Sequence, residues 1–262
     1  MFGLFASFTD YSPFVTHLRF TGLANYAYLL ADSFFGASFR TIALFSFVTV
    51  PLELLIGFAV AFLLRDRFRG WSVVRVVLLI PWLISPVANG VMWHFLYASA
   101  SGIPGYVSAL LGLPPLPSPL GSKVLALPAT MLAEIWRMSP LVSFLLLPGL
   151  LAIPRPLWEQ ATLEGAPILF VMGRIALPWI RPLLLTTGML LLGWALGTFD
   201  SILILTGGGP GTETLTPALY SYQRAFEANN WHVGATAAWC IVILVVLVGA
   251  LYITLSRREA AE

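Results

Sequence analysis

The sequence predicts an all-α protein, a polytopic bundle of transmembrane helices. The chain of 262 residues is 58% hydrophobic and only 10% charged, whereas about a quarter of the residues in a soluble domain are charged. Its apolar residues are gathered in five runs, each long enough for a helix to cross the hydrocarbon core of a bilayer. Because a bilayer excludes open sheet edges, such runs with short connections predict helices rather than strands.

The five expected spans follow one another along the chain. They cover residues 41–64, 73–97, 124–151, 183–205 and 235–255. Residues 1–40 are expected to form an external segment, residues 152–182 a connecting loop, and residues 256–262 a short tail. The single cysteine, Cys240, lies in the last run, so neither a disulfide within the chain nor a cysteine metal site is expected.

The distribution of basic residues predicts the orientation. Eight arginines fall on one side of the expected membrane, and four basic residues fall on the other. The first set is Arg65, Arg67, Arg69, Arg155, Arg174, Arg181, Arg257 and Arg258, and the second set is Arg19, Arg40, Lys123 and Arg224. The positive-inside rule therefore places the loop 152–182 and the C-terminal tail in the cytoplasm.

The loop contains an unusually polar stretch, EQATLEGAPILFVMGRIALP, at residues 159–178. Prolines suit the first turn of a helix, and a glycine in the left-handed region suits its end. We therefore expect one short helix after Pro154 that ends at Gly165, and a second that begins at Pro167 and stops before Pro178. From the pattern alone, an amphipathic loop lying on the lipid surface is the alternative.

The same stretch resembles a known motif. EQATLEGA at 159–166, with IALP at 175–178 and Pro182, resembles the EAA loop of permease subunits of binding-protein-dependent ABC importers. Gln160 stands where the family usually has alanine, and Glu164 where it has aspartate. Other stretches resemble its carbohydrate and glycerol-phosphate branch, with members like maltose permease F and glycerol-phosphate permease A. They are PW at 81–82, SP at 85–86, MW at 92–93, FD at 199–200, LTGGGP at 205–210, AF at 225–226 and GA at 234–235.

The resemblance implies a multi-pass permease of the type I ABC importer kind, which translocates a sugar or related polyol across the bacterial inner membrane. It implies that the first loop helix docks on a cytoplasmic ATPase subunit. The coupling residues are then Glu159, Ala161, Glu164, Gly165, Ala166, Leu177 and Pro178.

The resemblance also implies partners: a second permease subunit forming a heterodimer, two ATPase subunits, and an extracytoplasmic solute-binding protein that contacts the outer loop 206–234. FTDY at 8–11 resembles the segment just outside the first family helix. We therefore expect five full spans, with that first helix largely missing from the sequence.

Polar side chains within spans are costly and mark functional candidates. Sugars are bound by aromatic faces and hydrogen-bonding groups, so the candidate substrate pathway is Asn89, Trp93, Glu134, Trp136 and Asp200. Each has a structural alternative. Glu134 and Arg137 stand three residues apart and can pair on one helix face, and tryptophans inside a bundle commonly pack between helices.

The chain has no G-x-x-x-x-G-K-[ST] phosphate loop, so no catalytic residue is expected and energy must come from a partner. ATP and Mg²⁺ are expected to be used by the ATPase subunits. No metal, cofactor or nucleic acid is expected for this chain itself. Two alternatives stay open: a secondary transporter or facilitator working alone, and a degenerate membrane subunit that does not transport.

Overall fold

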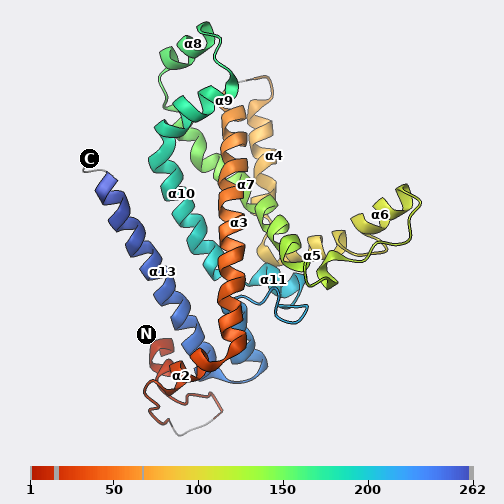
Figure 1. Cartoon of the computed structure of the whole chain (residues 1–262), viewed down its shortest axis with the longest axis vertical. Helices are drawn as coiled ribbons and strands as arrows, with labels where there is room; N and C mark the ends of the chain where they lie inside the picture. The colour runs from red at the N-terminus through yellow and green to blue at the C-terminus, as the bar shows by residue number, and fades with distance from the viewer. Residues whose placement is uncertain (1, 15–17, 67, 260–262) are drawn as a thin grey trace. The chain divides into compact units, whose positions relative to one another are not determined.

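The computed structural model describes residues 2–14, 18–66 and 68–259, and in this part of the chain helices are the regular structure, with no named strand (Figure 1). Two short helices, α1 (Phe2–Ser7) and α2 (Ala24–Ala31), precede the long α3 (Ser33–Leu64). They are followed by α4 (Trp71–Leu83), α5 (Pro86–Leu96), α6 (Ile103–Leu110), a 3₁₀ turn (Pro119–Gly121) and α7 (Ala126–Leu151).

The second half begins with α8 (Arg155–Leu163) and α9 (Ile168–Val171), and a π-helical turn (Met172–Ala176) then joins α9 to α10 (Leu177–Gly197). The last elements are α11 (Asp200–Leu205), α12 (Pro217–Tyr222), a second π-helical turn (Gln223–Glu227) and α13 (Trp231–Glu259). The predicted all-α fold is thus confirmed.

Four helical segments in the described residues are long and apolar enough to cross a membrane, or five if a broken pair counts as one span. The four are Ser33–Leu63, Ala126–Leu151, Ile168–Gly197 and Trp231–Ala250, and the pair is Trp71–Leu83 with Pro86–Leu96. A helical membrane bundle is therefore confirmed, although the prediction of five uninterrupted spans at the expected bounds is not.

Three span predictions were wrong in detail. The expected helix 73–97 is broken because Pro86 disfavours helical backbone at the residue before it, and Ile84 is already extended (ψ 127°). The expected helix 183–205 is interrupted at Phe199 (φ −147°), where the Thr216 hydroxyl donates to the Thr198 carbonyl (3.1 Å). The expected start at residue 41 is late, because the Asp32 carboxylate accepts from the Phe34 N–H (2.8 Å) and begins α3 earlier.

A fourth prediction, that the helix opened by Pro167 stops before Pro178, was also wrong. The π-helical turn at Met172–Ala176 carries the chain without a stop into α10. Pro178 falls in the first turn of α10, where the missing N–H of a proline is tolerated. The π turn just before it shifts the local hydrogen-bond register, so the helix continues past the proline.

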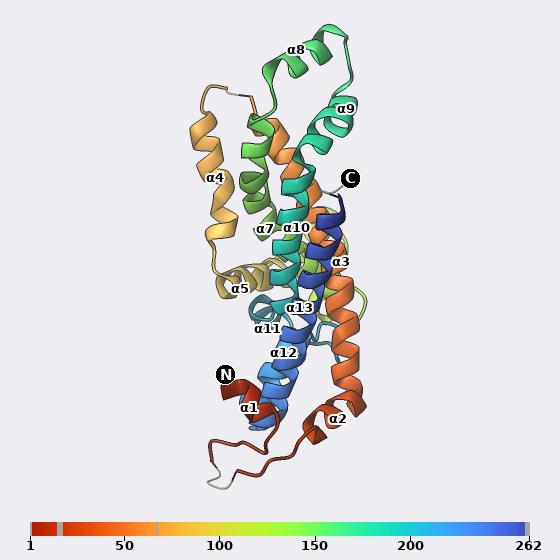
Figure 2. The same cartoon turned by 90° about the vertical axis from the view of Figure 1, so that its left-hand side faces the viewer.

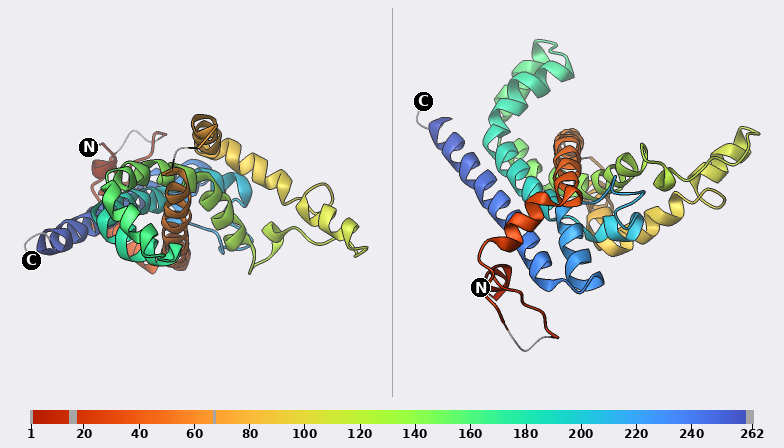
Figure 3. Two further views of the ribbon diagram at one scale, coloured as in Figure 1. Left: turned by 90° about the horizontal axis from the view of Figure 1, so that it is seen from above. Right: turned by 60° about the horizontal axis from the view of Figure 1, so that its bottom comes forward.

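The helices form two compact units, one comprising Met1–Phe47, Pro86–Met131 and Gly193–Glu262, and the other Val48–Ser85 and Leu132–Leu192. In the first unit, α13 packs against α1, α2 and α12 (Figure 2). A Cβ added at Gly234 would lie 2.6 Å from Ala225 Cβ, so only glycine permits this approach. Also in this unit, α5 packs on α11, and the α6 segment extends from α5 away from α11 (Figure 3).

The second unit contains the ends of the long helices that lead to the loop 152–182. Small residues allow close crossings there, as is common in membrane bundles. Gly57 of α3 meets Val142 of α7, and a Cβ at Gly149 of α7 would lie 2.8 Å from Leu183 Cδ2 of α10. Figures 1 and 2 show α8 and α9 at one end of this unit.

Candidate functional site

The connection between α7 and α10 builds a short helix with defined ends. Pro154, in extended backbone (ψ 132°), precedes the first turn of α8. At the other end, Gly165 has φ +66°, the Ala166 N–H donates to the Ala161 carbonyl (2.9 Å), and the Gly165 N–H donates to the Thr162 carbonyl (3.1 Å). These two bonds form a Schellman motif. The predicted glycine cap is therefore confirmed.

Arg65 fastens α8 to the end of α3. Its guanidinium carbon lies 4.0 Å from the centre of the Phe62 ring and 4.1 Å from the centre of a Trp158 ring. The two aromatic side chains meet edge to face, with centroids 5.9 Å apart. Beside this joint lies a hollow of about 1120 Å³, lined in part by Glu159 and Leu163 of α8. One side of α8 is thus held against the end of α3, and the other side is exposed.

The open side of the loop carries large apolar side chains. Leu163 is 87% exposed and Leu169 is 78% exposed, and Ile168 and Phe170 are also exposed. Exposed apolar side chains of this size are ones that a partner protein or the lipid surface would cover. We refer to Leu163, Ile168, Leu169 and Phe170 as the loop patch.

The predicted coupling residues do not all share one surface. Ala161 is buried and Ala166 half-buried, whereas the Glu159 and Glu164 side chains and Gly165 are exposed. The remaining two, Leu177 and Pro178, are exposed in the first turn of α10. The two acids are therefore available to a partner, while Ala161 and Gly165 shape the helix that presents them.

The predicted substrate-pathway residues divide between the two units. In the first, Asn89 and Trp93 lie on the buried face of α5, which packs on α11, the helix that Asp200 begins. In the second, Glu134 of α7 is buried and pairs with Arg137 of the same helix (2.6 Å from Oε1 to Nη2), so the pairing that the sequence left open does form.

Trp136, also on α7, is 38% exposed. Glu53 of α3 is buried and interacts electrostatically with Glu134 and Arg137. Two acids and one arginine thus lie together inside this unit.

A second polar cluster, which no sequence pattern indicated, lies in the first unit. The Asp32 carboxylate accepts from the Tyr220 hydroxyl (2.7 Å) and from Arg224 Nη2 (2.6 Å), and its other oxygen accepts from the Phe34 N–H. Burial acts to raise the pKa of Asp32, but these hydrogen bonds and the charge of Arg224 outweigh it and hold the pKa below its ordinary value of 3.8. Because these partners stand about 190 residues from Asp32, no local pattern could have indicated the contact.

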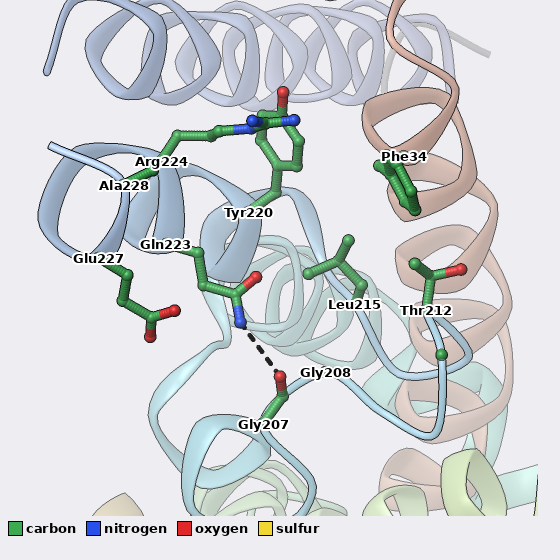
Figure 4. A pocket seen from close by; sticks show the side chains of 11 residues that line it. Phe34, Gly207, Gly208, Thr212, Leu215, Tyr220, Gln223, Arg224, Glu227 and Ala228 are labelled. Carbon is green, nitrogen blue, oxygen red and sulfur yellow. Dashed lines mark hydrogen bonds between the residues drawn. The ribbon is translucent and has the colours of Figure 1, made fainter. Parts of the chain in front are cut away.

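This cluster, together with the loop that follows α11, borders a hollow of about 460 Å³ (Figure 4). Gly207, Gly208 and Gly211 have positive φ angles, which glycine adopts without strain. The Gln223 amide donates to the Gly207 carbonyl (3.1 Å). Within the described part of the chain, no group of three His, Cys, Asp or Glu side chains is placed to hold a metal ion.

These features define a multi-pass helical membrane protein with a rigid, partly apolar loop at one end of one unit. Comparison with known proteins narrows this class. The chain is 33% identical over 245 residues to the trehalose/maltose transport system permease protein MalF of Thermococcus litoralis, covering 93% of this chain and 82% of the relative. It is 30% identical to the sulfoquinovosyl glycerol transport system permease protein SmoG of Agrobacterium fabrum. That match covers 92% of this chain and 78% of the relative.

Among solved structures, the fold is similar to a chain of a bacterial alginate ABC transporter crystallised with an alginate pentasaccharide-bound periplasmic protein. The TM-score is 0.81 at 19% identity, covering 91% of this chain and 83% of that one. A scan against models of protein families finds no match. The chain belongs to the ABC transporter permease subunits, in their sugar-transport branch, and is a transport protein.

Proposed function

We propose that the chain is one of two different permease subunits of an ATP-driven importer, and that it passes a sugar or related polyol across the inner membrane by alternating access. The names of its relatives, which refer to trehalose, maltose and sulfoquinovosyl glycerol, support this substrate class. The segments Ile168–Gly197 and Trp231–Ala250 are mostly unburied within the chain itself, which supports a second permease subunit that packs against them.

The loop 152–182 is proposed to dock on a cytoplasmic ATPase subunit, and two such subunits are proposed to bind ATP and Mg²⁺ and carry out hydrolysis. The single observation that carries this proposal is the construction of α8. A Schellman cap and the Arg65 joint fix the helix, while the loop patch, Glu159 and Glu164 are exposed. A rigid helix can transmit a push or pull that a slack loop would absorb.

An extracytoplasmic binding protein is proposed to deliver the sugar to the opposite side, near residues 206–234. The alginate transporter's complex with a periplasmic protein supports a partner of this kind. Arginine placement supports a cytoplasmic C-terminus. Within the membrane, Asn89, Trp93, Glu134, Trp136 and Asp200 are proposed to line the substrate pathway.

The substitution Gly165→Asp tests the coupling role. Aspartate is among the residues that tolerate φ +66°, so the substitution mainly adds a negative charge beside the docking surface. In proteoliposomes containing the assembled transporter, we expect sugar uptake to fall at least tenfold. A matched control is Gly112→Asp, because Gly112 also has positive φ (+65°) and open space around it but lies outside the loop.

Normal capture of the ATPase subunit together with normal stimulated turnover in Gly165→Asp would refute the coupling role. Failure of the unaltered chain to capture any ATPase subunit would refute the proposed function itself.

A further inference from the structure

The hollow in the first unit is a built recess on the loop between α11 and α13. Its volume, about 460 Å³, lies within the range of roughly 300–1,000 Å³ typical of small-molecule sites. Gln223, Arg224 and Glu227 line one side, and Phe34, Thr212 and Leu215 line another (Figure 4). All of these residues belong to the same unit.

The lining combines apolar surfaces with hydrogen-bonding groups of both kinds. The Phe34 ring and Leu215 offer apolar surface, the Glu227 carboxylate can only accept, and the amide of Gln223 can do both. The Thr212 hydroxyl adds a further group that donates and accepts. The C–H faces and hydroxyl groups of a sugar match this combination.

The charged residues that line the recess, together with Asp32 behind them, disfavour one class of sugar. Arg224 is already neutralised by Asp32, with which it forms an ion pair of 2.6 Å. No ion pair joins Glu227 to a cation in the described part of the chain. The recess therefore carries an excess of negative charge, which disfavours anionic sugars such as uronates.

Glycines allow the loop around the recess to adopt its backbone conformation, and the Asp32 cluster fixes one wall of the recess. A Cβ added at Gly208 would lie 3.2 Å from Leu215 Cδ1, so the loop packs directly against Leu215, one of the lining residues. Asp32 binds both Tyr220 and Arg224 and thereby fixes the wall from which Gln223 and Glu227 extend. Asp32 is thus a positioning residue that does not itself line the recess.

We propose that this recess is a subsite for a neutral sugar or polyol, distinct from the pathway residues inside the spans. The proposal rests on the proposed sugar-import function, and it names the class of sugar that the chain accepts at this surface. Glu227 and Gln223 bind hydroxyl groups, and Glu227 rejects carboxylated sugars.

The test measures binding of trehalose, maltose and glucuronate to the assembled permease and ATPase complex in nanodiscs, without the binding protein. We expect weak binding of a neutral disaccharide and none of glucuronate. Gln223→Ala and Glu227→Ala should each raise the Kd for the disaccharide at least fivefold, and Glu227→Gln should make glucuronate binding detectable. Glu213→Gln is the matched control, because Glu213 is an exposed acid of the same loop that does not line the recess.

Sugar binding that is unchanged by Gln223→Ala and Glu227→Ala would overturn the proposal. Absence of sugar binding in a complex that imports sugar normally with its binding protein would also overturn it, while leaving the proposed function intact. Failure of the proposed function would appear separately, as failure to capture an ATPase subunit in the co-purification described above.

Discussion

Two connections of this protein, the loop 152–182 and the loop 206–234, are held by different means. The first is shaped mainly by its own backbone, with the Arg65 contact on Trp158 as an added support: prolines begin its helices, and a Schellman cap at Gly165 ends α8. The second is held by side chains from distant parts of the chain, because Asp32 binds Tyr220 and Arg224. In the second loop, Ser221 also donates to the Gly234 carbonyl (2.8 Å).

The difference fits the two roles proposed for these loops, docking for the first and ligand binding for the second. Local backbone bonds keep α8 rigid while its side chains stay free for a partner. Long-range side-chain bonds fix the wall of a recess against the start of α3, so the recess depends on the packing of its whole unit. Substitutions should therefore damage the two loops for different physical reasons.

The largest effect is expected from Gly234→Val in the second loop. The new Cβ would lie 2.6 Å from Ala225 Cβ and 2.8 Å from the Ser221 carbonyl oxygen, so α12 and α13 must separate. Overpacking of this kind costs about 3 kcal/mol, and we expect a clear fall in the Tm of the purified protein. Gly36→Ala is the control, because its Cβ would meet nothing within 4 Å. An unchanged Tm for Gly234→Val would show that α13 is not closely packed against Ala225 and Ser221.

An intermediate, pH-dependent effect is expected from Asp32→Asn. The loss of charge-assisted hydrogen bonds to Tyr220 and Arg224 should cost about 2 kcal/mol at pH 7. Because the folded-state pKa of Asp32 is depressed, its contribution is full above the unfolded pKa of about 3.8 and is lost as the pH falls through the folded pKa.

Thermal unfolding of the Asp32→Asn variant and the unaltered protein, followed from pH 7 to pH 3, checks this expectation. The difference in Tm should shrink below about pH 4. Asp66→Asn is the control, because the Asp66 side chain is 79% exposed in its pair with Arg65 and should contribute little. A Tm difference that persists unchanged at pH 3 would contradict the charge-based account.

The smallest effect on stability is expected from Gly165→Ala in the first loop. A Cβ there meets nothing within 4 Å, so the cost is only that of the left-handed backbone, about 1 kcal/mol. Gly165→Asn should cost less, because asparagine tolerates this conformation. Chemical or thermal unfolding measures the stability of both variants. A loss of stability as large as that of Gly234→Val would mean that a side chain at position 165 clashes with its neighbours, and that the cost is not only that of the left-handed backbone.

The same distinction explains what could be predicted from the sequence. The glycine cap at Gly165 depends on neighbouring residues and was predicted, as was the all-α membrane fold, which follows from long apolar runs. The break at Ile84 could have been anticipated from Pro86, whereas the interruption at Phe199 is accompanied by a hydrogen bond from Thr216 to the Thr198 carbonyl, which no local pattern indicates. The Asp32 cluster and the recess require contacts across about 190 residues, which periodicity and motif spacing do not report.

The central claim is that the first loop is the surface on which an ATPase subunit docks. Leu163 tests it most directly, because its side chain is 87% exposed on α8. In a Cys240→Ser background, which removes the native thiol, Leu163→Cys provides a unique site for maleimide labelling. Leu111→Cys, at an exposed apolar position in the other unit, is the matched control.

We predict that the ATPase subunit slows labelling at position 163 at least tenfold and leaves labelling at position 111 unchanged. Equal labelling rates at position 163 with and without the ATPase subunit, in a complex shown to be assembled, would contradict the account.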